Sequence, residues 1–207
     1  RIDVLTQARI PFITLGRSNT AGTHPWIDLD FEGVAARAVD RLVAAGHERI
    51  AVAVPSNDIN LGFLFLDGYK AALQRHGIAF NPQLVLRVPS SEQGGYQLGY
   101  DLLAMEQRPS AVILNYELLA VGLFRRLGEC GILPGRDLAV IGFRESPTAR
   151  FLSPPLTCFR LSLHELGIAL GEALLASMPA YAETYPLGAV RRIWPMELIA
   201  GDSDKEI

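Results

Sequence analysis

Residues 46–77 read GHERIAVAVPSNDINLGFLFLDGYKAALQRHG. The unbroken apolar run at residues 50–54 is typical of a strand that is covered on both faces, as strands of parallel sheets are. A segment with helical spacing follows this run. Gly77 ends that segment, and Gly46 ends the helix before the strand, because glycine adopts the left-handed conformation without a Cβ penalty. The stretch therefore predicts one strand–helix unit of an α/β fold.

The same unit recurs along the chain at a spacing of roughly 30 residues, which is the size of a βαβ unit. Three more apolar runs are bounded by polar or turn residues, at residues 84–88, 111–114 and 138–141. Gly131 supplies a third helix-ending glycine just before the last of them. The chain therefore predicts a βαβαβαβ series and a regularly wound parallel sheet.

Some segments lie outside this series. They are predicted strands at residues 10–16 and 26–29, an extended segment at 156–160, a helix at 162–177 and an extended run through Trp194. So few elements cannot close a core by themselves. They either add to the main sheet or belong to a second lobe whose remainder lies upstream of Arg1.

The composition indicates a folded protein that carries no general signature of nucleic-acid binding. The 207 residues are 49% hydrophobic and 20% charged, and 19 basic against 22 acidic residues leave a net charge of −3. No apolar run approaches the roughly 18 residues of a membrane span. Cys130 and Cys158 lack disulfide or metal spacing, so both are expected to be buried free thiols. Together these features predict a cytoplasmic protein without a membrane partner.

In an open parallel sheet the ligand crevice lies beyond the carboxyl ends of the strands. The segments that follow the four apolar runs are residues 55–60, 89–92, 115–117 and 142–146. They are rich in hydrogen-bonding side chains but contain no nucleophile–base pair. The chain has neither a glycine-rich phosphate loop nor a GxSxG elbow, and its four histidines are dispersed. The prediction is therefore binding without catalysis, with no cofactor or metal.

Two features of these segments leave alternatives open. Residues 63–66 are four consecutive apolar residues near the start of a helix, and they cannot all face the sheet. Either one of them points into the crevice or at a partner, or the helix is buried on both sides. Arg144 directly follows a buried strand. It could bind a ligand carboxylate or sugar hydroxyls, or it could form an ion pair with Glu145 or Glu117.

Several motifs resemble, in this order, the effector-binding core of the LacI/GalR family of bacterial transcription regulators. They are PFITLGR at 11–17, GHERIA at 46–51, DGYKAAL at 67–73, LAVG at 119–122, GILPGRDLAVIGF at 131–143, PPLT at 154–157 and PMELI at 195–199. The resemblance runs over nearly the whole chain.

The resemblance implies a periplasmic-binding-protein-like type I α/β fold, with two lobes that each have a parallel sheet flanked by helices and a ligand cleft between them. On this mapping, residues 30–159 and 195–207 form the C-terminal lobe. Residues 1–29 and 160–194 form an incomplete N-terminal lobe. The DNA-binding helix-turn-helix of the family would precede Arg1.

The family's ligand positions carry over unevenly to this chain. Asn115 matches an asparagine that contacts the effector in relatives. Phe65 stands where the family usually has an arginine, Arg144 where it has an aspartate, and Ser90 near its usual stacking aromatic. The complete set of expected ligand-binding residues is Asn57, Asp58, Leu61, Phe65, Ser90, Asn115, Arg144 and Glu145.

The expected function is that of an effector-sensing domain of a dimeric, cytoplasmic transcriptional repressor or related regulator. A small carbohydrate or similar metabolite would bind between the lobes, and their closure would alter the affinity of a preceding DNA-binding domain for its operator. The first alternative is a periplasmic sugar-binding protein of a transporter. The second is an enzyme of the doubly wound type, which the composition of the crevice disfavours.

Overall fold

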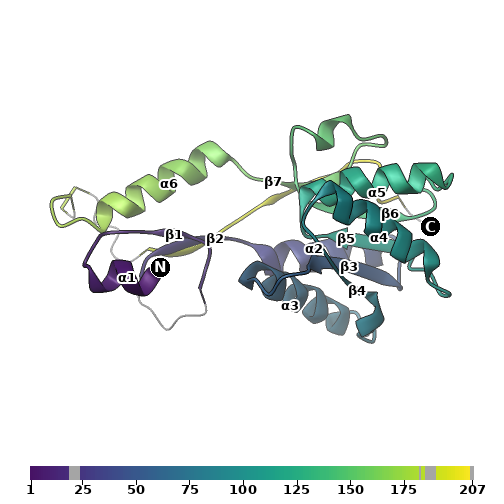
Figure 1. Cartoon of the computed structure of the whole chain (residues 1–207), viewed down its shortest axis with the longest axis horizontal. Coiled ribbons are helices and arrows are strands. Elements are labelled where there is room, and N and C mark those ends of the chain that lie inside the picture. The colour runs from purple at the N-terminus through teal and green to yellow at the C-terminus, as the bar shows by residue number, and fades with distance from the viewer. Residues whose placement is uncertain (19–23, 182, 185–189, 206–207) are drawn as a thin grey trace. The chain divides into compact units, whose positions relative to one another are not determined.

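The computed structural model describes residues 1–18, 24–181, 183–184 and 190–205 (Figure 1). It divides the chain into two compact units. The smaller unit consists of Arg1–Asp30 and Leu161–Met196, and the larger one of Phe31–Arg160 and Glu197–Ile207. The chain therefore passes from one unit to the other three times.

A six-stranded sheet forms the centre of the larger unit. Its strands, in spatial order, are β4 (Val85–Val88), β3 (Ile50–Pro55), β5 (Ala111–Leu114), β6 (Ala139–Arg144), β7 (Thr157–Arg160) and β9 (Glu197–Ile199). All neighbouring pairs are parallel except β7 and β9. The four apolar runs of the sequence thus form adjacent strands, which confirms the predicted parallel α/β fold.

Two pairs of helices cover this sheet. Helix α4 (Glu92–Ala104) packs against α5 (Glu117–Glu129), and α2 (Phe31–Ala44) packs against α3 (Asn60–Arg75). The α4–α5 pair lies on the face that presents alternate strand residues: Ala51, Ala53, Val112, Leu114 and Val140. The intervening residues of these strands are also buried, and α2 and α3 contact the strands that carry them. Both faces are therefore covered, as the unbroken apolar runs require.

The predicted helix-ending glycines are confirmed. Gly46, Gly77 and Gly131 have φ angles of +91°, +69° and +69°, which lie in the left-handed region. They follow α2, α3 and α5 and direct the chain into the segment that leads to the next strand.

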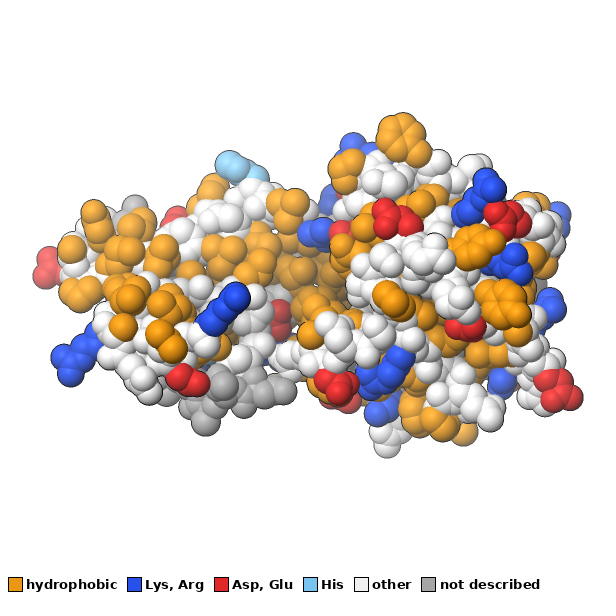
Figure 2. Space-filling model, viewed as in Figure 1, with side chains coloured by type: hydrophobic (Ala, Val, Ile, Leu, Met, Phe, Trp, Pro, Cys, Tyr) orange, Lys and Arg blue, Asp and Glu red, His pale blue; other side chains and the backbone are white. Residues whose placement is uncertain are grey.

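The smaller unit has a three-stranded parallel sheet in the order β1 (Thr14–Leu15), β2 (Trp26–Leu29) and β8 (Arg191–Trp194). It also contains α1 (Ile2–Gln7) and α6 (Leu163–Ala176), and the Ser162 side chain caps α6. Strand β1 is shorter than the predicted strand at residues 10–16. Figure 2 shows apolar side chains gathered over the part of this unit where α6 lies, and Leu163 there is 64% exposed.

Of the segments outside the βαβ series, some extend the main sheet and others belong to the second unit, so each of the two alternatives applies to part of them. Strands β7 and β9 extend the main sheet of the larger unit, whereas α6 and β8 belong to the smaller unit. No helix within the described residues is long and apolar enough to cross a bilayer.

The two cysteines differ in a way that the sequence did not indicate. Cys158 lies on β7 and is buried, and burial raises the pKa of its thiol to about 11. Cys130 is exposed, so the expectation of two buried thiols is wrong for this residue. Cys130 follows the last residue of α5 and precedes the left-handed Gly131, where the chain turns at the surface.

Candidate functional site

A hollow of about 340 Å³ lies beyond the carboxyl ends of β3, β4, β5 and β6, entirely within the larger unit. The residues that line it are Phe31, Ile59, Leu61, Ser90, Asn115, Tyr116, Glu117, Phe143 and Arg144. Open parallel sheets bind their ligands at this edge, because the loops that follow neighbouring strands converge there. The hollow is therefore the candidate binding site.

Asn115 is the polar group placed most deeply in the hollow. It follows β5 directly and its relative exposure is only 2%. Neither its side-chain oxygen nor its side-chain nitrogen has a hydrogen-bond partner within the described part of the chain. Burying an amide without a partner costs about 1–3 kcal/mol. Asn115 thus offers a donor nitrogen and an acceptor oxygen to a bound molecule.

Arg144 lines the same hollow and is paired with Glu117. Its Nη2 donates a hydrogen bond to Oε1 of Glu117 at 2.6 Å, whereas its buried Nε has no partner among the residues described. Glu117 lies in the first turn of α5, where the helix dipole stabilises a negative charge. Of the alternatives left open for Arg144, the ion pair is therefore present with Glu117, and the buried Nε–H donor remains available.

Glu145 does not reach this hollow. Its carboxylate accepts a hydrogen bond from Nε of Arg160 at 2.7 Å, and this contact holds the pKa of Glu145 below its ordinary value. It lines a separate hollow of about 250 Å³ together with Cys158. Its position beside Arg144 in the sequence therefore does not make it a neighbour in the site.

One wall of the hollow is aromatic. The Phe31 and Phe143 rings stack with centroids 5.0 Å apart and planes 9° apart. Phe65 meets Phe143 edge-on at 6.1 Å from behind this wall, and its exposure is 0%. Phe65 does not line the hollow, so the structure does not support its expected contact with a ligand.

The apolar residues at positions 63–66 point in different directions. Phe65 enters the core, whereas Phe63 is 41% exposed and lines a small separate hollow with Leu66. The helix is thus not buried on both sides. Leu61, one turn before Phe65, is the residue of α3 that reaches the candidate site.

The structure brings together Leu61, Ser90, Asn115 and Arg144 from the expected set. Asn57 lines the small hollow beside Phe63. Asp58 is exposed and forms an ion pair with Arg87 at 3.3 Å. The expectation that Asn57 and Asp58 share a site with Asn115 is therefore not supported, because neither residue lines the hollow.

The expected set missed five residues that line the hollow: Phe31, Ile59, Tyr116, Glu117 and Phe143. Four of them are sequence neighbours of expected residues or lie in the segments that follow the strands. Phe31 begins α2 and follows the predicted strand at residues 26–29, which is not one of the four apolar runs whose ends were searched for site residues.

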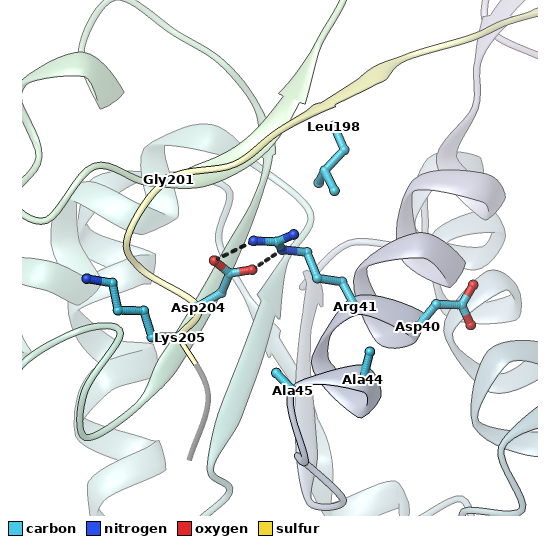
Figure 3. Close-up of a pocket in the computed structure, with 8 residues that line it drawn as sticks. All are labelled: Asp40, Arg41, Ala44, Ala45, Leu198, Gly201, Asp204 and Lys205. Atoms are coloured by element: carbon cyan, nitrogen blue, oxygen red, sulfur yellow. Dashed lines mark hydrogen bonds and ion pairs between the residues drawn. The ribbon is translucent and has the colours of Figure 1, made fainter.

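A second hollow, of about 810 Å³, lies between α2 and the C-terminal segment (Figure 3). Asp204, which is buried, pairs with Arg41 and accepts a hydrogen bond from the Thr157 hydroxyl. The hydrogen-bonding capacity of the buried Asp204 carboxylate is thus used by Arg41 and Thr157. The hollow thus lacks the combination of burial and unused hydrogen-bonding capacity that Asn115 has.

Beside this segment, the buried His47 is expected to make the protein less stable as the pH falls below about 6.5. Burial lowers the pKa of His47, although the Lys205 carbonyl and Asp204 act in the opposite direction. The unfolded chain therefore binds a proton more readily than the folded one. The stabilisation is complete above the ordinary pKa and is lost as the pH falls towards the lower pKa of the folded state.

Denaturant unfolding at about pH 7.5 and about pH 5.5 measures this effect. The neutral ring lies 2.9 Å from the Ser110 hydroxyl oxygen through Nδ1. The His47→Gln variant is expected to lose less stability between the two pH values than the wild type, whereas a variant of the exposed His164 should behave like the wild type. Identical losses in His47→Gln and the wild type would contradict this assignment.

Comparison with known sequences gives consistent matches. The sequence model of the periplasmic binding protein-like domain family matches residues 39–203. The HTH-type transcriptional repressor CytR of Escherichia coli (strain K12) is 29% identical over 183 residues, which are 88% of this chain and 52% of CytR. The chain thus spans about half the length of the curated relatives that it matches.

Solved structures give the same result. A regulatory protein of the LacI family from Chloroflexus aggregans superposes with a TM-score of 0.88 and 30% identity, covering 99% of this chain and 72% of that one. A LacI family transcriptional regulator from Enterococcus faecium, solved with bound ribose, superposes with a TM-score of 0.85 and 25% identity, covering 99% and 74%.

Proposed function

Because the chain belongs to the LacI family, with its periplasmic binding protein-like domain, we propose that it binds a small effector in the hollow around Asn115. The effector is a carbohydrate or a related metabolite. The observation that carries the proposal is the Asn115 side chain, which is buried in the hollow and has both amide atoms unused among the described residues. The ribose bound to the relative from Enterococcus faecium supports this ligand class.

In the whole protein, this chain is the sensing part of a DNA-binding regulator that acts as a homodimer. Its larger unit corresponds to the C-terminal lobe, and its smaller unit corresponds to part of the N-terminal lobe. Effector binding favours one arrangement of the lobes by differential affinity and thereby alters operator binding by a preceding helix-turn-helix. The relatives reported above are regulators, which favours this role over that of a transporter's periplasmic sugar-binding protein.

Asn115→Ala and Arg144→Ala are each expected to weaken effector binding by about 1–3 kcal/mol, since each removes a hydrogen bond in a buried site. A thermal-shift screen of sugars and related metabolites on the intact protein identifies the effector, because a ligand that binds only the folded state stabilises it. Calorimetry then gives the affinities of the variants. Asn57→Ala is the matched control, because Asn57 lies outside the hollow, and its affinity should equal that of the wild type.

If both Asn115→Ala and Arg144→Ala bound the effector with the affinity of the wild type, the hollow would not be the effector site. The regulatory part of the proposal has its own measurement. The effector is expected to change the affinity of the intact wild-type protein for operator DNA, and Asn115→Ala should require a higher effector concentration for the same change. An operator affinity that does not respond to a bound effector would contradict a sensing role.

A further inference from the structure

We infer that the effector bound in this hollow is uncharged, and that Glu117 sets this selectivity by holding the Arg144 guanidinium. The inference rests on the proposed function and concerns the same hollow. It makes Glu117 a determinant of specificity that rejects phosphorylated and carboxylated analogues of the effector.

The charges that line the hollow cancel. Of the described residues that line it, Glu117 and Arg144 alone are charged, and they form one ion pair at 2.6 Å. Glu145, which adjoins Arg144 in the sequence, is bound to Arg160 outside the hollow. The site therefore presents no net charge to a ligand.

Without its partner, Arg144 would favour anions. A guanidinium in a partly enclosed site binds carboxylate or phosphate oxygens strongly, because its donors match them in pairs. In this structure Nη2 of Arg144 already donates a hydrogen bond to the Glu117 carboxylate. An anionic ligand would have to displace this carboxylate or lie beside it, and like charges in a partly buried site repel each other.

Glu117 is held in a position where it can pair with Arg144. It is largely buried and lies in the first turn of α5, where the helix dipole favours a carboxylate. Among the buried side-chain polar atoms of the described residues that line the hollow, Nε of Arg144 and the two amide atoms of Asn115 have no hydrogen-bond partner. Together they offer two kinds of donor and one acceptor, which suits hydroxyl or amide groups of a neutral molecule.

The test uses inorganic phosphate as an anion probe, so it does not depend on knowing the effector. Nuclear magnetic resonance follows the Asn115 side-chain amide and the Arg144 Nε–H of the intact protein during a phosphate titration. Glu117→Gln keeps the shape of the side chain and removes its charge. This variant is expected to bind phosphate in the hollow at least about ten times more tightly than the wild type does.

Glu129→Gln is the matched control, because it removes the same charge from the last residue of the same helix. It should leave phosphate binding in the hollow as weak as in the wild type. The double variant Glu117→Gln/Arg144→Gln should lose the gain, which shows that Arg144 is the group set free. Thermal unfolding of each variant confirms that it is folded.

Two results would overturn the inference. One is wild-type protein that binds phosphate in the hollow as tightly as Glu117→Gln does. If the variant fails to fold, tight phosphate binding in the wild-type titration alone gives the same contradiction. The other is a folded Glu117→Gln variant that gains no phosphate affinity. Either result leaves the proposed function intact. That function fails on a different result, namely effector binding that survives both Asn115→Ala and Arg144→Ala.

Discussion

Replacement of Gly122 by alanine is expected to lower the free energy of unfolding by about 3 kcal/mol or more. Gly122 lies on α5 at a close contact with α4. A Cβ atom added there would overlap the Glu92 carbonyl oxygen and would lie 2.5 Å from the backbone nitrogen of Tyr96. Both obstacles are backbone atoms of α4, so no side chain can move to make room. The two helices would have to separate over the main core.

Gly128→Ala is the matched control on the same helix. A Cβ atom at Gly128 meets nothing within 4 Å, and alanine has the higher helix propensity. This variant should be unchanged or more stable by up to about 1 kcal/mol. Denaturant unfolding of both variants measures the difference. Equal stabilities of Gly122→Ala and Gly128→Ala would show that the α4–α5 contact is looser than described.

Phe65→Ala is expected to destabilise the protein by about 3–5 kcal/mol, the usual cost of removing a large buried ring. The Phe65 side chain is fully buried and supports Phe143 from behind the aromatic wall of the hollow. Because Phe65 itself does not line the hollow, the loss of stability should exceed any loss of effector affinity.

Phe63→Ala tests whether this effect is specific to the core position. Phe63 lies on the same helix and is partly exposed, so its replacement should cost about 1 kcal/mol or less. Melting and calorimetry of both variants separate stability from binding. A Phe65→Ala variant that keeps its melting temperature and loses the effector would place the ring against the ligand instead.

The parts of the fold that the sequence predicts best are those set by local chemistry. Apolar runs such as residues 50–54 and 111–114 become buried strands because a parallel sheet covered on both faces removes both of their sides from water. Gly46 and Gly77 end helices because their φ angles are those that other residues avoid. In contrast, strand β9 joins β7 from the far end of the chain. No local pattern specifies that pairing.

The candidate site was predictable to the level of the sheet edge but not of each side chain. Asn115 and Arg144 lie in the hollow because they directly follow β5 and end β6. The direction of a loop residue depends on packing around it, which the sequence does not show. The exposed Asp58 therefore pairs with Arg87, whereas Phe65 packs against Phe143 in the core. Likewise, only the structure decides that Arg144 pairs with Glu117 and not with the adjacent Glu145.

The central claim is that a bound small molecule supplies the hydrogen-bond partners of the buried Asn115 side-chain amide. A crystal structure of the intact protein with its effector tests this claim most directly. We expect effector atoms within hydrogen-bond distance, about 2.7–3.2 Å, of both Asn115 amide atoms, beside the Phe31–Phe143 wall. An effector bound elsewhere, with the Asn115 amide still without a partner, would contradict the account.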